Sequence, residues 1–152
     1  MDPLRITIDT REQRPWSFPP ERASAEIGTL RTGDYALAGD ECFAVERKSL
    51  DDSVGTISSG WDRFQRELDR MEHFPAKIVI VEGSFSELVF SGEGDRMIEP
   101  AHQHYNITPA FAMKRLGQLL YQGVAVVFAE NPEYSAAVCL SVLKERRTAN
   151  EQ

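Results

Sequence analysis

Three acidic residues stand where predicted β-strands end, the place where α/β folds put their functional sites. Asp9 follows the alternating segment LRITI, Asp34 lies in TGDY, and Glu46 lies near the end of FAVERK. Lys48 comes two residues after Glu46, so both side chains point to one face of a strand. Adjacent strands would bring Asp34 and Glu46 close together, and Mg²⁺ or Mn²⁺ would relieve their repulsion. With a lysine to orient or deprotonate a water, the predicted chemistry is phosphodiester hydrolysis.

The pattern of Asp, Glu and Lys is weak by itself, because chance matches are common in a chain with 24 acidic residues. Plainer interpretations exist for each residue. Glu46 and Lys48 could form an ordinary surface salt bridge, Asp34 could be a turn residue after Gly33, and Asp9 could cap a strand end. The surrounding sequence is far more specific than the pattern.

Four stretches carry that specificity, in this order along the chain: IDTREQRPWSF, LRTGDYAL, VERKSLDD and GWDRFQRELDRM. In order and spacing they resemble the nuclease domain of the XPF family, which comprises structure-specific DNA endonucleases with a restriction-endonuclease-like core. The resemblance covers nearly the whole chain and is strongest from Ile8 to Arg70.

The family's hallmark, GD…ERK-x-x-x-D, is present as Gly33-Asp34, Glu46-Arg47-Lys48 and Asp52. An upstream D-x-R-E element is present as Asp9-Thr10-Arg11-Glu12. The family's Gly-Arg-Phe is altered here to GWDRF, so Arg63 is the match of its arginine. The resemblance therefore extends residue by residue to the predicted site.

The resemblance implies a role for each residue of these motifs. Asp34 and Glu46 would be the primary ligands of Mg²⁺ or Mn²⁺, and Lys48 would position the attacking water. Asp9 would complete the metal site or bind a second ion. The residues that would shape the rim, steady the site or meet phosphates are Glu12, Arg11, Arg47, Asp52 and Arg63.

Charge gives the main argument against a nucleic-acid partner, because the net charge is −7 and phosphate binding usually needs a basic surface. Carboxylates gathered around a metal are another cause of excess acid. Arg63, Arg66 and Arg70 recur at i, i+3 and i+7 on a predicted helix, so that face could follow a DNA backbone locally. The same stripe could instead be a solvated helix face.

The order of elements predicts the fold. Strands come first, followed by helix, strand, helix, strand and helix, which indicates an α/β domain with a mixed central sheet flanked by helices. KIVIVEG and VAVVFAE are continuous apolar runs, typical of strands covered on both faces. The predicted helices are Leu50–Ile57 with Ser49 as N-cap, Trp61–Phe74, one beginning near Pro109 and ending before Gly123, and Pro132–Arg147.

We expect a single nuclease domain over residues 1–147, a frayed tail at 148–152 and no helix-hairpin-helix domain. Cys42 and Cys139 both resemble small buried hydrophobes, and the expected location is cytoplasmic, or nuclear in a eukaryote, with no membrane partner. A zinc site at His102-x-His104 is only weakly indicated. Trp16 and Phe18 could stack on a base but are better explained as packing their loop.

The predicted function is a metal-dependent DNA endonuclease acting near flaps, forks or junctions in repair or recombination. Its partner would be branched DNA, and the resemblance implies a homodimer formed through the nuclease domain. Two alternatives stay open. One is a non-catalytic junction-binding or scaffold module for a partner nuclease, and the other is a general or restriction-type nuclease acting on linear duplex.

Overall fold

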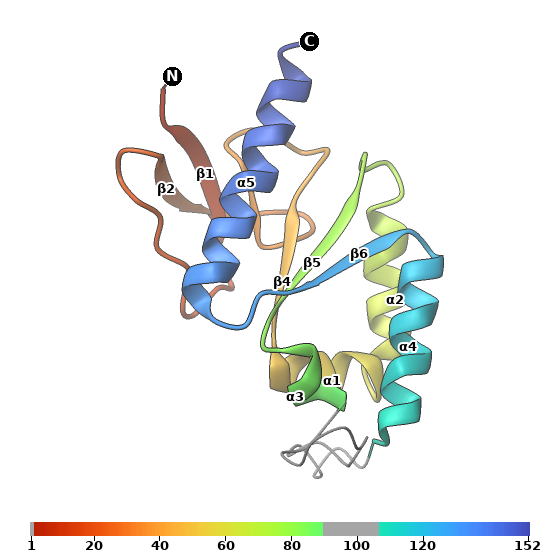
Figure 1. Cartoon of the computed structure of the whole chain (residues 1–152). Helices are drawn as coiled ribbons and strands as arrows, with labels where there is room; N and C mark the ends of the chain where they lie inside the picture. Colours follow the sequence, from red (N-terminus) through yellow and green to blue (C-terminus); the bar gives the residue numbers. More distant parts are fainter. Residues whose placement is uncertain (1, 90–106) are drawn as a thin grey trace.

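The computed structural model describes residues 2–89 and 107–152, and its centre is a six-stranded mixed sheet (Figure 1). The spatial order is β2-β1-β3-β4-β5-β6. The strands are β1 (Leu4–Asp9), β2 (Ala23–Gly28), β3 (Tyr35–Leu37), β4 (Val45–Ser49), β5 (Lys77–Glu82) and β6 (Val124–Phe128). β3 is antiparallel to both of its neighbours, β1 and β4, and the other adjacent pairs are parallel.

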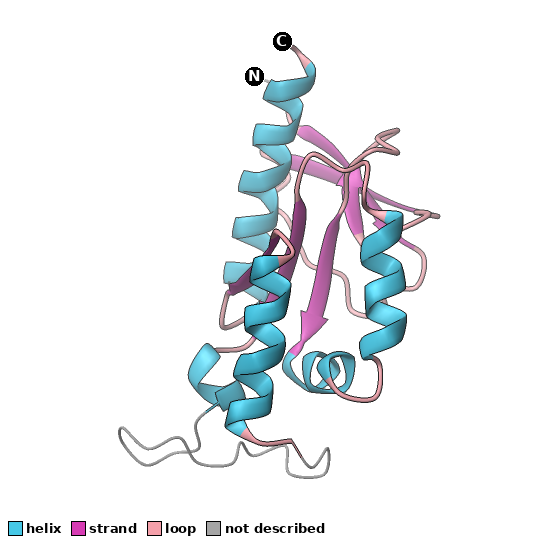
Figure 2. Cartoon of the chain, turned by 90° about the vertical axis from the view of Figure 1, so that its right-hand side faces the viewer, coloured by secondary structure: helices cyan, strands magenta, loops and turns pink. Residues whose placement is uncertain are grey.

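Helices cover both faces of this sheet (Figure 2). They are α1 (Leu50–Ile57), α2 (Trp61–Arg70), α3 (Phe85–Val89), α4 (Pro109–Tyr121) and α5 (Pro132–Asn150). On one face, α5 packs Leu140 and Leu143 into a core with Ile80 of β5. On the other face, α2 and α4 pack against Val79 and Val81 of the same strand. Both faces of β5 are therefore apolar, which explains its continuous apolar sequence.

Local sequence sets where the helices begin. The Ser49 hydroxyl accepts a hydrogen bond from the Asp52 N–H at 3.1 Å, which confirms Ser49 as the N-cap of α1. Thr108 caps α4 in the same way, and Pro109 occupies its first turn as predicted. Gly123 follows the end of α4 with a φ of 82°, a left-handed conformation that favours glycine.

Four sequence predictions were wrong in detail. β6 is less buried than predicted: Val124 is buried, Ala125 is exposed and the other three residues are half-buried. Its two faces still pack against the cores on opposite sides of the sheet, through Val127 on one side and Val126 on the other. Cys42 is exposed because β4 begins only at Val45. Helix α2 ends at Arg70 in a turn, before the predicted Phe74. Helix α5 continues to Asn150, so most of the tail expected to fray is helical.

The polar loop predicted over residues 92–106, with His102 and His104, lies outside the described residues. Within the described ranges, no helix combines the length and the apolar character needed to cross a membrane.

Candidate active site

Gly33 places Asp34 at the start of β3. Its φ of 86° is left-handed, and a Cβ added there would lie 2.5 Å from the Ala44 Cβ, so only glycine fits without a shift. The Asp34 N–H donates to the Val45 carbonyl, and the Asp34 carbonyl accepts from the Asp9 N–H, each at 2.9 Å. The Gly-Asp pair is therefore turn chemistry that also joins the ends of β1 and β4.

Asp34 and Glu46 come together across the β3–β4 pair, as predicted. Tyr35 is the register partner of Val45, which sets Asp34 opposite Glu46 at the mouth of this pair. The Asp34 Oδ2 accepts a hydrogen bond from the Arg47 N–H at 2.8 Å. Glu46 is only 7% exposed, and its Oε1 lies 3.3 Å from the Lys48 Nζ. Glu46 and Lys48 do form an ion pair, but the half-buried carboxylate of Asp34 lies close enough to act on Glu46 as well.

The electrostatics of this pair favour a cation. Burial raises the pKa of Asp34 above its ordinary value, and nearby Glu12 raises it further. Burial also raises the pKa of Glu46, and the charges of Asp34 and Glu67 add to that shift. Lys48 opposes these effects but does not cancel them. The carboxylates therefore carry unfavourable interactions that an added positive charge would relieve.

The donor set fits a hard divalent cation. In residues 2–89 and 107–152 there is no group of three or more His, Cys, Asp or Glu side chains placed to share one ion. Asp34 and Glu46, which face each other across the β3–β4 pair, could hold such an ion together with waters and a substrate phosphate. Mg²⁺ is commonly bound in this way, through one or two carboxylates and substrate phosphates.

Asp9 is fully buried at the end of β1 and already has protein partners for both carboxylate oxygens. Its Oδ2 accepts from the Arg11 N–H at 3.0 Å and from the Arg11 Nε at 2.6 Å, while its Oδ1 accepts from the Leu30 N–H at 2.9 Å. Burial raises the Asp9 pKa, but the hydrogen bonds from Arg11 and Leu30 outweigh burial and lower it. These contacts connect the ends of β1 and β2. A metal role for Asp9 stays a prediction.

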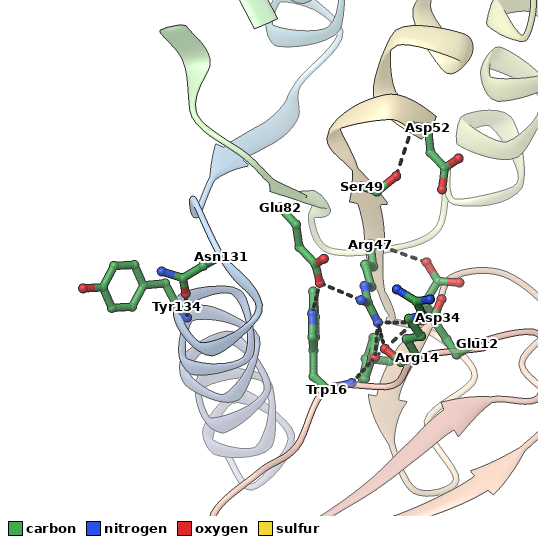
Figure 3. A network of polar contacts seen from close by, with 11 residues as sticks. Glu12, Arg14, Trp16, Asp34, Arg47, Ser49, Asp52, Glu82, Asn131 and Tyr134 are labelled. Carbon is green, nitrogen blue, oxygen red and sulfur yellow. Dashed lines mark hydrogen bonds and ion pairs between the residues drawn. The ribbon is translucent and has the colours of Figure 1, made fainter. Parts of the chain in front are cut away.

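Arg47 is the centre of a polar network beside Asp34 (Figure 3). Its Nη1 lies 2.8 Å from the Glu12 Oε2, and its Nη2 lies 2.7 Å from the Glu82 Oε1. The guanidinium also lies over the Trp16 ring, 4.9 Å from the ring centroid. The sequence predicted that Arg47 either steadies the site or contacts phosphate. Because both ends of its guanidinium already pair with protein carboxylates, the structure favours the first role.

Tyr35 and Glu82 belong to the same network, although no role was predicted for either residue. The Tyr35 hydroxyl accepts from the Trp16 N–H at 2.9 Å and donates to the Glu12 Oε2 at 3.1 Å. The Trp16 indole N–H donates to Glu82. Glu82 ends β5, so the rule that flagged acidic residues at strand ends would have found it. Trp16 is 4% exposed and stacks on Tyr35, which confirms packing over base stacking for this residue.

An open cleft of about 500 Å³ lies in front of the acidic pair. Lys48, Asp52 and Arg63 also line it, so the structure brings these predicted residues to one site. A smaller hollow of about 160 Å³ also contains Asp34 and Glu46. Its other lining residues are Arg11, Arg31, Thr32, Gly33, Glu67 and Arg70. Arg66 lines neither space.

Comparison with known proteins gives the family and the fold of this chain. The ERCC4 domain family matches residues 8–141. A predicted ATP-dependent RNA helicase of Methanocaldococcus jannaschii is 28% identical over 152 residues, covering 96% of this chain but only 17% of that protein's length. XPF from Aeropyrum pernix superposes with a TM-score of 0.62 at 20% identity, covering 93% of this chain and 61% of that one, and so shares its restriction-endonuclease-like α/β fold. With the family match covering most of the sequence, the chain belongs to the ERCC4 domain family of XPF-type nucleases.

Proposed function

We propose that this chain is a divalent-metal-dependent DNA endonuclease that hydrolyses phosphodiester bonds near flaps, forks or junctions, in DNA repair or recombination. One observation carries the proposal. Asp34 and Glu46 are held together with raised pKa values at the floor of an open cleft that also contains Lys48. Two such carboxylates held side by side lower the stability of the folded protein, and groups with pKa values shifted in this way cluster at functional sites. Membership of the ERCC4 domain family supports the same conclusion.

Each residue of the cleft has a role in this proposal. Asp34 and Glu46 would hold Mg²⁺ or Mn²⁺, and the Arg47 N–H fixes the Asp34 carboxylate by a hydrogen bond. When bound, the ion would supply positive charge against the charge that develops on the phosphoryl oxygens. Lys48 has its Nζ 5.5 Å from the Phe64 ring centroid and beside Glu46, where it can orient the attacking water or take a proton from it.

We also propose that the chain acts as a homodimer, as the family resemblance implies. Apolar side chains on α4 lie in solvent: Met113 is 37% exposed, Leu120 54% and Tyr121 95%. Exposed apolar groups gathered on one helix are typical of protein interfaces. β6, which pairs with β5 on one side, leaves its other edge open among the described strands.

The decisive test is cleavage of a labelled 3′-flap and a matched linear duplex, with Mg²⁺, with Mn²⁺ and with EDTA. We expect metal-dependent cutting that favours the flap. Asp34→Ala and Glu46→Ala should each lower the rate by at least about a thousandfold, roughly 4 kcal/mol of barrier. Glu26→Ala, an exposed residue of β2, is the matched control and should cut at the wild-type rate.

Other outcomes have definite meanings. Equal cutting of flap and duplex would indicate a general nuclease. Binding of branched DNA without cutting in either metal would indicate a junction-binding module that needs a partner chain. Activity of Asp34→Ala within tenfold of wild type would remove Asp34 from the proposed mechanism.

A further inference from the structure

A third hollow, of about 670 Å³, lies next to the acidic pair on the side away from Arg63. It shares Arg31, Thr32 and Arg70 with the smaller hollow that contains Asp34 and Glu46. The three spaces therefore follow one another, from Arg63 past the acidic pair to the loop before β4. We call the third space the Cys42 hollow, after the exposed cysteine in its lining.

The entrance to the Cys42 hollow carries two arginines that the fold does not use. Arg31 and Arg70 are both exposed, and neither has an ion-pair partner among the described residues. By contrast, Arg11 and Arg47 are both held by carboxylates of the protein. Arg31 and Arg70 lie on one side of the acidic pair and Arg63 lies on the other. When the scissile phosphate of a DNA strand lies at the acidic pair, these arginines could bind the phosphates on either side of it.

The wall of the Cys42 hollow is suited to a base rather than to a second phosphate. Leu30, Phe43, Ala44 and Phe74 contribute apolar surface to its lining. The exposed His73 ring lies edge-on to Phe74, with 4.9 Å between ring centroids. A volume of about 670 Å³ is in the range of pockets for small molecules. The bases of a duplex are stacked inside it, so only an unpaired nucleotide could turn its base into such a space.

We infer that the Cys42 hollow binds an unpaired nucleotide of the strand that crosses the acidic pair. Arg31 and Arg70 hold its phosphate, and its base lies against Leu30 and Phe74. This inference rests on the proposed function, since it takes DNA as the substrate at Asp34 and Glu46. It also explains how a single protomer could favour branched DNA, because the site would accept a strand that is unpaired on one side of the cut.

The native cysteine provides the test. Cys42 is exposed in the hollow and Cys139 is buried, so in the folded protein a maleimide should report on Cys42. The alkylation rate is measured in EDTA, with single-stranded and blunt duplex oligonucleotides of equal length, each at ten times its dissociation constant from fluorescence anisotropy. At that concentration an occupying ligand leaves about one-tenth of sites free, so single strands should slow alkylation about tenfold and duplex less than about twofold.

Arg31→Ala is the companion variant, with Arg5→Ala, an exposed arginine of β1 that lines none of the three spaces, as its control. For single strands, Arg31→Ala should reduce the slope of log affinity against log salt by about 0.7, the loss of one phosphate contact. Arg5→Ala should keep the wild-type slope.

Equal protection of Cys42 by single strand and duplex, or no protection by bound single strand, would overturn the inference. If Arg31→Ala keeps the wild-type dependence of affinity on salt, Arg31 does not contact a phosphate of the bound strand. These measurements use no metal and no cleavage, so they test the Cys42 hollow independently of the proposed function. Protection of Cys42 without DNA cleavage would support nucleotide binding in the hollow and contradict the proposed catalysis. Cleavage without protection of Cys42 would support the catalysis and contradict the binding.

Discussion

At the scale of single residues, the molecule places its unfavourable charges where chemistry is proposed. Burial beside Asp34 raises the pKa of Glu46 to about 8, and burial raises that of Asp34 to about 6. Arg47 and Asp9, which belong to the same predicted site, are instead satisfied by protein partners. The network around Arg47 therefore supports the two carboxylates without neutralising them.

The raised pKa of Glu46 predicts how stability depends on pH. An unfolded glutamic acid loses its proton near pH 4.5, whereas Glu46 in the folded protein keeps it to about pH 8. Between these values the folded state binds more protons, so the free energy of unfolding of the metal-free protein should fall as pH rises. Glu46→Gln should flatten this dependence and be more stable than wild type at pH 8 by at least about 1 kcal/mol, the equivalent of roughly one pKa unit.

Urea unfolding in EDTA at several pH values between 5 and 8 measures this effect. Addition of Mn²⁺ should restore stability most at high pH, where both carboxylates are charged. Glu133→Gln, an exposed residue in the first turn of α5, controls for the loss of one carboxylate. Parallel pH curves for wild type and Glu46→Gln would contradict the prediction.

Arg47 gives a second prediction at this scale. Its guanidinium is 14% exposed and pairs with Glu12 and Glu82, which are 16% and 13% exposed. Arg47→Ala would leave both carboxylates without their cation, so we expect a loss of about 2–4 kcal/mol in the free energy of unfolding. Arg47→Lys should recover only part of this, because a single ammonium cannot form both contacts in the same planar geometry. Chemical denaturation checks the order, and full rescue by lysine would refute the role of the fork.

At the scale of elements, α1 connects β4, the strand that carries Glu46 and Lys48, to the wall of the cleft. It begins directly after β4, and its residues Asp52, Gly55 and Thr56 line the cleft beside Glu46. The hydrogen bond from the Asp52 N–H to the Ser49 hydroxyl defines where the strand stops and the helix starts. The geometry of the cleft therefore depends on one helix cap.

Ser49→Ala should remove that cap and lower the free energy of unfolding by about 1 kcal/mol. It should also slow cleavage several-fold at a temperature where the variant is fully folded, because the wall of the cleft loses its anchor. Thr108→Ala removes the equivalent cap of α4, which does not line the cleft, and should cost similar stability without slowing cleavage. Equal rates for the two variants would show that the α1 cap acts on stability alone.

At the scale of the whole molecule, the exposed apolar face of α4 predicts self-association. Wild type should be a dimer by light scattering, and Leu120→Glu should shift it to a monomer, since a charge would then lie within the proposed interface. Tyr134→Glu, on α5 and 59% exposed, is the control and should keep the wild-type mass. A monomeric wild type at tens of micromolar would refute the dimer.

The sequence by itself determined the local features and the chemical type of the site. An alternating pattern indicated β1, a continuous apolar run indicated β5, and short-range side-chain chemistry indicated the Ser49 cap and the ends of α4. The motifs around Asp34, Glu46 and Lys48, more than the spacing of the three residues alone, indicated the acidic pair and its lysine, and their separation along the chain fits two adjacent strands. These features depend on a few neighbouring residues, and so they can be predicted from short stretches of the sequence.

Only the tertiary structure decided which strands lie at the edges and which charges are already used. β6 looked like a fully buried strand, but how far its faces are covered depends on the helices that pack over them, and Ala125 is left exposed. Arg31, Arg47 and Arg63 are alike in sequence, yet Arg47 is held by Glu12 and Glu82 while the other two face open spaces. The partners come from segments far apart in the chain, and it is their meeting in space that separates a structural arginine from one free to bind phosphate.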